Sequence, residues 1–86
     1  MNTLILRNRP RKSGDNVNYS IEIIGDSAIK DDIRESIRAL EYHPAKASRR
    51  NIIDMMSLIE KHKLNIRYTE HYFEEEIEHW MFVLQG

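Results

Sequence analysis

Apolar and polar residues alternate in the first third of this 86-residue chain. The alternation runs over residues 17–23 and predicts a β-strand with one buried face. Its apolar positions are Val17, Tyr19, Ile21 and Ile23. A shorter apolar segment over residues 3–8 predicts an earlier strand, and residues 9–16 between the two are rich in turn formers. We therefore expect two strands joined by a loop over residues 9–16.

The apolar spacing then changes to a helical period. A first stripe spaced four, four and three residues apart predicts an amphipathic helix that begins near an Asp26 or Ser27 N-cap. This stripe is Ile29, Ile33, Ile37 and Leu40. Pro44 interrupts the pattern, and a second helix is expected from Pro44 or from a Ser48 cap to about His62. Its apolar positions are Ile52, Ile53, Met55, Met56 and Ile59. Because the connector is short, the two helices should pack antiparallel.

The last part of the chain predicts a second pair of strands, over residues 64–69 and 80–84. A three-residue loop at Glu74–Glu76 would pair Ile66 with Leu84, Tyr68 with Phe82, and Glu70 with Trp80. That register gathers the large apolar side chains on one face: Ile66, Tyr68, Trp80, Phe82 and Leu84. A two-residue loop would turn Trp80 and Phe82 to the other face and bury less aromatic area, so we favour the first register. A short helix over residues 72–79 is the competing interpretation.

These elements predict a single α+β domain over residues 1–86. We expect a four-stranded antiparallel sheet in the order ββααββ, with a two-helix hairpin packed on one face. The order of the strands in the sheet is left open by the sequence. Following the chain up and down places three connections at the same end of the domain. They are the loop over residues 9–16, the helix connector and the turn at Glu74–Glu76.

Charge is strongly segregated along the chain. Residues 1–13 carry four bases and no acid, and residues 70–78 carry five acids and no Lys or Arg, although the formal net charge is −1. Small proteins with such polarity commonly bind charged partners, and loops at one edge of a scaffold are frequent binding sites. The alternative is that these charges solvate loops and pair weakly with one another. The expected partner-binding residues are Arg9, Arg11, Lys12, Lys46, Arg49, Arg50, Glu74, Glu75 and Glu76.

The face of the sheet turned away from the helices is a second candidate surface. In the favoured register it carries an apolar patch that would suit a protein contact or a homodimer interface. The patch comprises Ile5, Phe73, Ile77, Met81 and Val83. Scattered apolar exposure, or a different register, is the alternative interpretation.

The sequence gives little support for a catalytic site or a metal site. The absence of cysteine excludes disulfides, thiolate metal sites and cysteine nucleophiles. There is no glycine-rich phosphate loop, and adjacent exposed glutamates do not form the pocket that acid–base catalysis needs. His71 and His79 face each other in the favoured register, but their spacing matches no established metal motif. We therefore expect no enzyme activity, no catalytic residue, no metal and no cofactor.

No apolar segment is long enough for a secretory signal or a membrane span, so the expected compartment is the cytoplasm. The sequence favours a small non-catalytic protein-binding module with no membrane role. By analogy of size and charge, it would be a stoichiometric inhibitor or regulator of a nucleic-acid-handling or host-defence complex, of the kind that viruses and mobile elements encode. The acidic turn would then mimic phosphates. The alternative is a nucleic-acid-binding protein that uses the basic N-terminal loop and the start of the second helix. A pI of about 6.4 argues against this alternative, because nucleic-acid-binding domains are usually basic.

Overall fold

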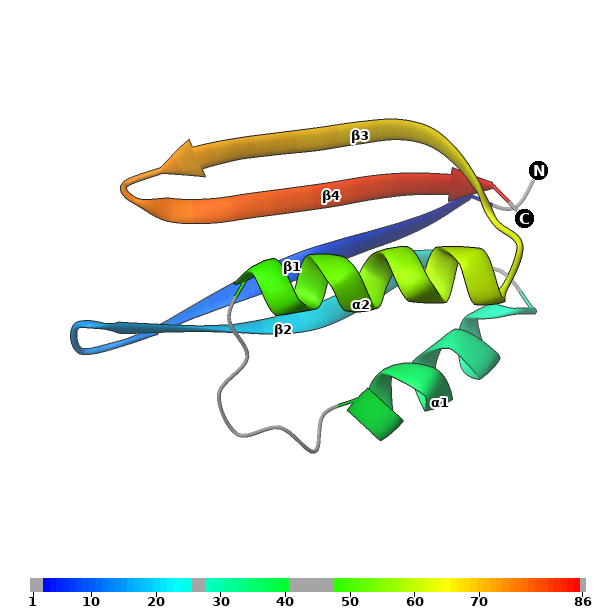
Figure 1. The fold of residues 1–86 in the computed structure, drawn as a ribbon, viewed down its shortest axis with the longest axis horizontal. Helices are drawn as coiled ribbons and strands as arrows, with labels where there is room; N and C mark the ends of the chain where they lie inside the picture. Colours follow the sequence, from blue (N-terminus) through cyan, green and yellow to red (C-terminus); the bar gives the residue numbers. More distant parts are fainter. Residues whose placement is uncertain (1–2, 26–27, 41–47, 86) are drawn as a thin grey trace.

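The computed structural model describes residues 3–25, 28–40 and 48–85. Four strands form one antiparallel sheet in the order β2-β1-β4-β3, and two helices that run in opposite directions lie on one face of it (Figure 1). The elements are β1 (Thr3–Ser13), β2 (Asn16–Gly25), α1 (Lys30–Leu40), α2 (Ser48–Lys61), β3 (Asn65–Glu74) and β4 (Ile77–Gln85). The predicted α+β fold and its ββααββ order are confirmed. Neither of these helices is long and apolar enough to cross a membrane.

The first hairpin has only a two-residue turn, so the predicted loop over residues 9–16 is wrong. Ser13 pairs with Asn16, so the turn contains only Gly14 and Asp15, and Gly14 has the positive φ of 61° that glycine adopts without strain. The segment expected as a basic loop is therefore mostly strand. Pro10 fits into β1 because pairing between β1 and β4 ends at Arg7, so no ladder partner on that side is lost.

The second hairpin is formed, and no helix occupies residues 72–79, but its register differs from the favoured one. Glu74 pairs with Ile77, which leaves a two-residue turn at Glu75 and Glu76. A bulge between Ile66 and Tyr68 compensates for this shift, so the predicted pairing of Ile66 with Leu84 is kept. Beyond the bulge Tyr68 pairs with Val83 instead of Phe82. Tyr68 therefore lies on the open face, which corrects its predicted place among the helix-facing residues.

The helices cover only part of the sheet. α1 packs on β2, and α2 packs on β1 and β2. The core between these layers comprises Leu4, Leu6, Ile21, Ile23, Ile33, Ile37, Met55, Leu58, Ile59, Leu64, Phe82 and Leu84. By contrast, every residue of β3 except the half-buried Glu70 is exposed. β3 is therefore an uncovered edge strand, and the hydrophobic core lies under β2, β1 and β4.

The helix ends show how the chain enters and leaves this layer. The backbone N–H of Ile33 donates to the carbonyl of Ile29, which begins the α1 ladder. The expected N-caps Asp26 and Ser27 lie outside the described residues, as do Pro44 and the helix connector. α2 ends where Lys63 takes a left-handed φ of 53° and the N–H of Leu64 donates to the carbonyl of Ile59. This turn directs the chain into β3.

Candidate functional site

A buried asparagine marks the point where the two hairpins separate. β1 and β4 stop pairing at Arg7, and the next residue, Asn8, is 2% exposed. Its Nδ2 donates to the carbonyl of Glu78 at 2.9 Å and to the Oγ of Ser48 at 3.0 Å, and its Oδ1 accepts the backbone N–H of Trp80. The side chain thus takes the place of a peptide group between the strands. The backbone N–H of Glu78 also donates to the Tyr19 hydroxyl at 3.2 Å. Beyond these contacts the two hairpins diverge toward their tips (Figure 1).

The tips of both hairpins lie at the same end of the molecule (Figure 1). A hollow of about 310 Å³ between them is lined by Lys12, Asp15, Val17, Glu75, Glu76 and Ile77. Of the basic and acidic residues expected to lie near one another, Lys12, Glu75 and Glu76 line this hollow together. Within residues 3–25, 28–40 and 48–85, no ion pair shorter than 4.0 Å involves Glu74, Glu75 or Glu76. We call Lys12, Asp15, Glu75 and Glu76 the charged end.

The acidic turn is held in an unfavourable backbone conformation. Glu75 has a φ of 50° and Glu76 a φ of 67°, so both are left-handed. A two-residue hairpin turn of this kind normally carries Asn-Gly, because left-handed backbone costs other L-residues about 1–2 kcal/mol each. Both side chains are exposed. The fold therefore presents two carboxylates at its tip at a cost in stability.

The other predicted cations do not join one cluster. Arg9 lines a groove between β2 and α1, whereas Arg49 lines a hollow of about 390 Å³ between α2 and the β3–β4 hairpin. Arg50 lies 3.6 Å from the Asp54 carboxylate one helical turn later. Arg11 lines a third hollow, along β2. Lys46 lies outside the described residues, so its predicted role is not placed.

The hollow beside Arg49 contains a polar and aromatic group. The Nε2 of His71 lies 2.9 Å from the Oε2 of Glu78, and the His71 ring stacks on Trp80 with centroids 3.7 Å apart and planes at 11°. Partial burial by itself raises the pKa of Glu78, but the hydrogen bond with His71 and the nearby polar groups of Ser48 and Trp80 outweigh it and hold that pKa below the ordinary 4.5. The carboxylate form of Glu78 is therefore favoured in the folded protein.

The two C-terminal histidines do not face each other, contrary to the favoured register. His71 pairs with Trp80, and His79 pairs and stacks with Tyr72 at a centroid distance of 4.6 Å. Because the pairing places them on opposite faces of the hairpin, the two imidazoles do not converge. Among the described residues, no three His, Asp or Glu side chains lie close enough together to hold a metal ion.

Large apolar side chains are exposed on both sides of β3. Phe73, expected on the open face, pairs with Glu78 and therefore lies on the helix side, where it is 64% exposed. This corrects the predicted patch, whose other members follow the expected alternation. The open face carries Ile5, Ile77, Met81 and Val83 together with Tyr68 and Tyr72. On the helix side Ile53 of α2 is also 63% exposed. We call the exposed apolar side chains on the helix side, Ile53, Ile66 and Phe73, the β3 surface.

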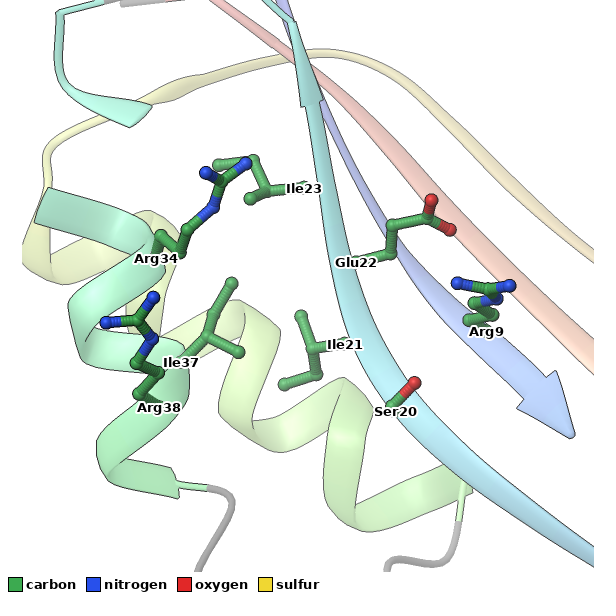
Figure 2. Close-up of a pocket in the computed structure, with 8 residues that line it drawn as sticks. All are labelled: Arg9, Ser20, Ile21, Glu22, Ile23, Arg34, Ile37 and Arg38. Atoms are coloured by element: carbon green, nitrogen blue, oxygen red, sulfur yellow. The ribbon is translucent and has the colours of Figure 1, made fainter. Parts of the chain in front are cut away.

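Two arginines near the groove between β2 and α1 are not among the binding residues expected from the sequence. Arg34 and Arg38 of α1 line the same groove as Arg9, which is far from them in sequence (Figure 2). Their spacing of four residues on one helix was the available signal, since it places two like charges on one helix face. The packing of α1 on β2, which places these arginines and Arg9 around one groove, is a tertiary feature.

No family model, curated protein or solved structure matches the chain.

Proposed function

We propose that this protein is a non-catalytic protein-binding module. The observation that carries the proposal is that the helices leave β3 uncovered. Large apolar side chains therefore remain exposed along β3 and the adjacent side of α2. Phe73 is 64% exposed, Ile53 63% and Ile66 44%. Exposed apolar side chains gathered on one part of a small protein mark an interaction surface. A partner bound at the β3 surface would cover the part of the sheet that the two helices leave exposed.

The charged end supports the same proposal from electrostatics. Lys12 lies beside Glu75 and Glu76 around one hollow, so both signs of charge are offered over a short distance. Complementary charges of this kind govern association rate and specificity more than affinity. The hydrophobic contact would therefore supply the affinity, and the charged end would select the partner.

The partner we propose is a nucleic-acid-handling or host-defence complex, with this protein acting as its stoichiometric inhibitor or regulator. Glu74, Glu75 and Glu76 lie together at the tip of a projecting hairpin, where carboxylates could occupy a channel that normally holds phosphates. The alternative, nucleic-acid binding by the basic residues, is weakened by their dispersal. Arg9 and Arg49 line different hollows, and Arg9 and Arg11 extend along a strand instead of a loop.

The test is a pull-down at physiological salt from a nuclease-treated host lysate. We expect one protein in stoichiometric amount on the wild-type bait. It should be lost with Glu74, Glu75 and Glu76 all changed to Lys, and with Phe73→Asp. Glu60→Lys, a charge reversal of an exposed glutamate on α2, is the matched control and should retain it.

Three outcomes would contradict the proposal. The first is that every retained protein disappears after nuclease treatment, which would favour nucleic-acid binding. The second is that the partner survives both the glutamate and the Phe73 variants. The third is that Met81→Asp on the open face abolishes capture while Phe73→Asp does not, which would move the contact to the other side of the sheet. Circular dichroism of each variant checks that the fold is intact.

A further inference from the structure

A groove of about 360 Å³ runs between α1 and the edge of the sheet at β2. In Figure 2, Arg34 and Arg38 lie side by side on α1, with Ile21, Ile23 and Ile37 between α1 and β2, while Arg9 and Glu22 lie on the far side of β2. We call this the β2–α1 groove. It is on the opposite edge of the sheet from β3, so its occupant would be separate from one bound at the β3 surface.

β2 is an edge strand, and one side of its backbone is unpaired within the sheet. In an antiparallel hairpin closed by a two-residue turn, the pair that flanks the turn is hydrogen-bonded and the pairs alternate from there. Since Ser13 and Asn16 flank the turn, Tyr19, Ile21 and Ile23 direct their N–H and C=O groups away from β1. A free edge of this kind is a template for another strand.

The lining of the groove carries an excess of positive charge. It contains three arginines and one glutamate: Arg9, Arg34, Arg38 and Glu22. The Oε2 of Glu22 lies 2.8 Å from the Nε of Arg7. The Oε1 of Glu35 lies 2.9 Å from the Nη1 of Arg38. In the described part of the chain, neither Arg9 nor Arg34 has a carboxylate within 4.0 Å.

The positive strip continues along the strand. Arg11 lines the neighbouring hollow of about 370 Å³ with Asn18, Tyr19 and Ser20. Ser20 lines both hollows, so they adjoin along β2. The segment of β2 from Asn18 to Ile23 would span about 20 Å, the length of a short extended peptide.

We propose that the β2–α1 groove binds an extended acidic peptide segment of a partner protein, which adds to β2 as a fifth strand. The backbone of the peptide would pair with the free edge, and its carboxylates would meet Arg34 and Arg38 on one side and Arg9 and Arg11 on the other. A phosphodiester chain fits less well, because the carbonyl oxygens at the strand edge would face phosphate oxygens. This inference goes beyond the function proposed above and does not depend on the charged end.

The probe is a phage-displayed library of short random peptides, selected on the wild-type protein. We expect enriched peptides to combine β-branched residues with Asp or Glu. A synthetic copy of the leading peptide is then measured by fluorescence anisotropy. Arg34→Glu should weaken its binding by about tenfold or more, equivalent to about 1.4 kcal/mol. The substitution suits the helix, because it replaces a like-charge pair with Arg38 by an opposite-charge pair.

Arg67→Glu is the matched control, since it makes the same charge change at an exposed position on the opposite edge strand. It should change affinity by less than about twofold, because surface charges that far away are screened by salt. N-methylation of alternate peptide amides should abolish binding, which tests the backbone pairing directly. Glu75→Lys should leave binding intact, so failure of the peptide test is distinguishable from failure of the proposed function.

Four results would overturn the inference. Selection could yield no peptide, or peptides without acidic residues. Arg34→Glu and Arg67→Glu could weaken binding equally, which would indicate a general effect of net charge. An oligothymidylate could compete at least as well as the peptide, which would assign the groove to nucleic acid. Finally, the protein could self-associate in a way that Arg34→Glu abolishes, which would make the occupant the acidic β3 strand of a second copy.

Discussion

The side-chain amide of Asn8 hydrogen-bonds to the backbone N–H of Trp80, 72 residues away in the sequence. The same amide donates to the carbonyl of Glu78, so it pairs with β4 as a backbone peptide group would. This relationship closes the gap that opens where β1 and β4 diverge. It allows two hairpins to leave one sheet without exposing broken ladder bonds in the core.

Replacing Asn8 should therefore be costly. Asn8→Leu removes the partners of the Trp80 N–H and the Glu78 carbonyl while keeping a side chain of similar size. An unsatisfied buried polar group costs about 1–3 kcal/mol, so we expect a loss of about 3 kcal/mol in the free energy of unfolding. Urea denaturation followed by Trp80 fluorescence measures it. Asn18→Leu, at an exposed position of β2, is the control and should change stability by less than about 0.5 kcal/mol.

For Asn51 we expect the opposite effect, a gain in stability when the residue is replaced. It is 0% exposed, and neither its Nδ2 nor its Oδ1 has a hydrogen-bond partner among the residues that the structure describes. Asn51→Leu removes this unsatisfied amide and improves helix propensity, so we expect about 1 kcal/mol of added stability. For a domain of this size the melting temperature should rise by about 4–8 °C. A fall in melting temperature would show that the amide is satisfied in the folded protein.

The acidic turn should show a trade between stability and binding. Changing Glu75 to Asn and Glu76 to Gly supplies residues that accept left-handed backbone, so thermal unfolding should show a gain of about 1–2 kcal/mol. If these carboxylates contact the partner, the stabilised variant should bind it more weakly. Glu75→Gln with Glu76→Gln is the control, because it removes the charge and keeps the strained conformation. Equal stability of the turn variant and the wild type would contradict the proposed strain.

Glu78 should make the fold sensitive to acid. Its pKa is below 4.5 in the folded state, so its ionised form stabilises the fold. That contribution is complete above the unfolded-state value and is lost as the pH falls through the folded-state pKa. Glu78→Gln should be less stable than wild type near neutral pH, and the difference should shrink below pH 4.5. Urea denaturation across this range measures both. A constant difference at every pH would sink the prediction.

Local patterning was enough to predict the elements of this fold. The alternation of Val17 to Ile23 and the stripe of Ile29 to Leu40 each required one buried face. Those faces contribute Ile21, Ile23, Ile33 and Ile37 to the core. Element types follow from such periodicity because side-chain direction repeats within a strand or a helix. The spacing of Trp80, Phe82 and Leu84 likewise predicts one shared face, and all three lie in the core or pack against it.

The register of the second hairpin was not predictable in the same way. Shifting a turn by one residue moves every side chain to the other face, and the turn at Glu75 and Glu76 lacks the Asn-Gly signal that would have revealed it. The bulge near Arg67 then restores the pairing of Ile66, which periodicity alone does not anticipate. Phe73 and Tyr68 changed faces for this reason.

The sequence by itself determined the two strand pairs, the two amphipathic helices and the separation of basic from acidic segments, because each is a property of neighbouring residues. The tertiary structure decided the order of the strands, and with it which edge carries the arginines and which the exposed aromatics. It also decided that Asn8 hydrogen-bonds to Trp80 and that Arg9 and Arg34 line one groove. Such contacts join residues far apart in the chain, so they depend on how the layers pack and not on local propensity.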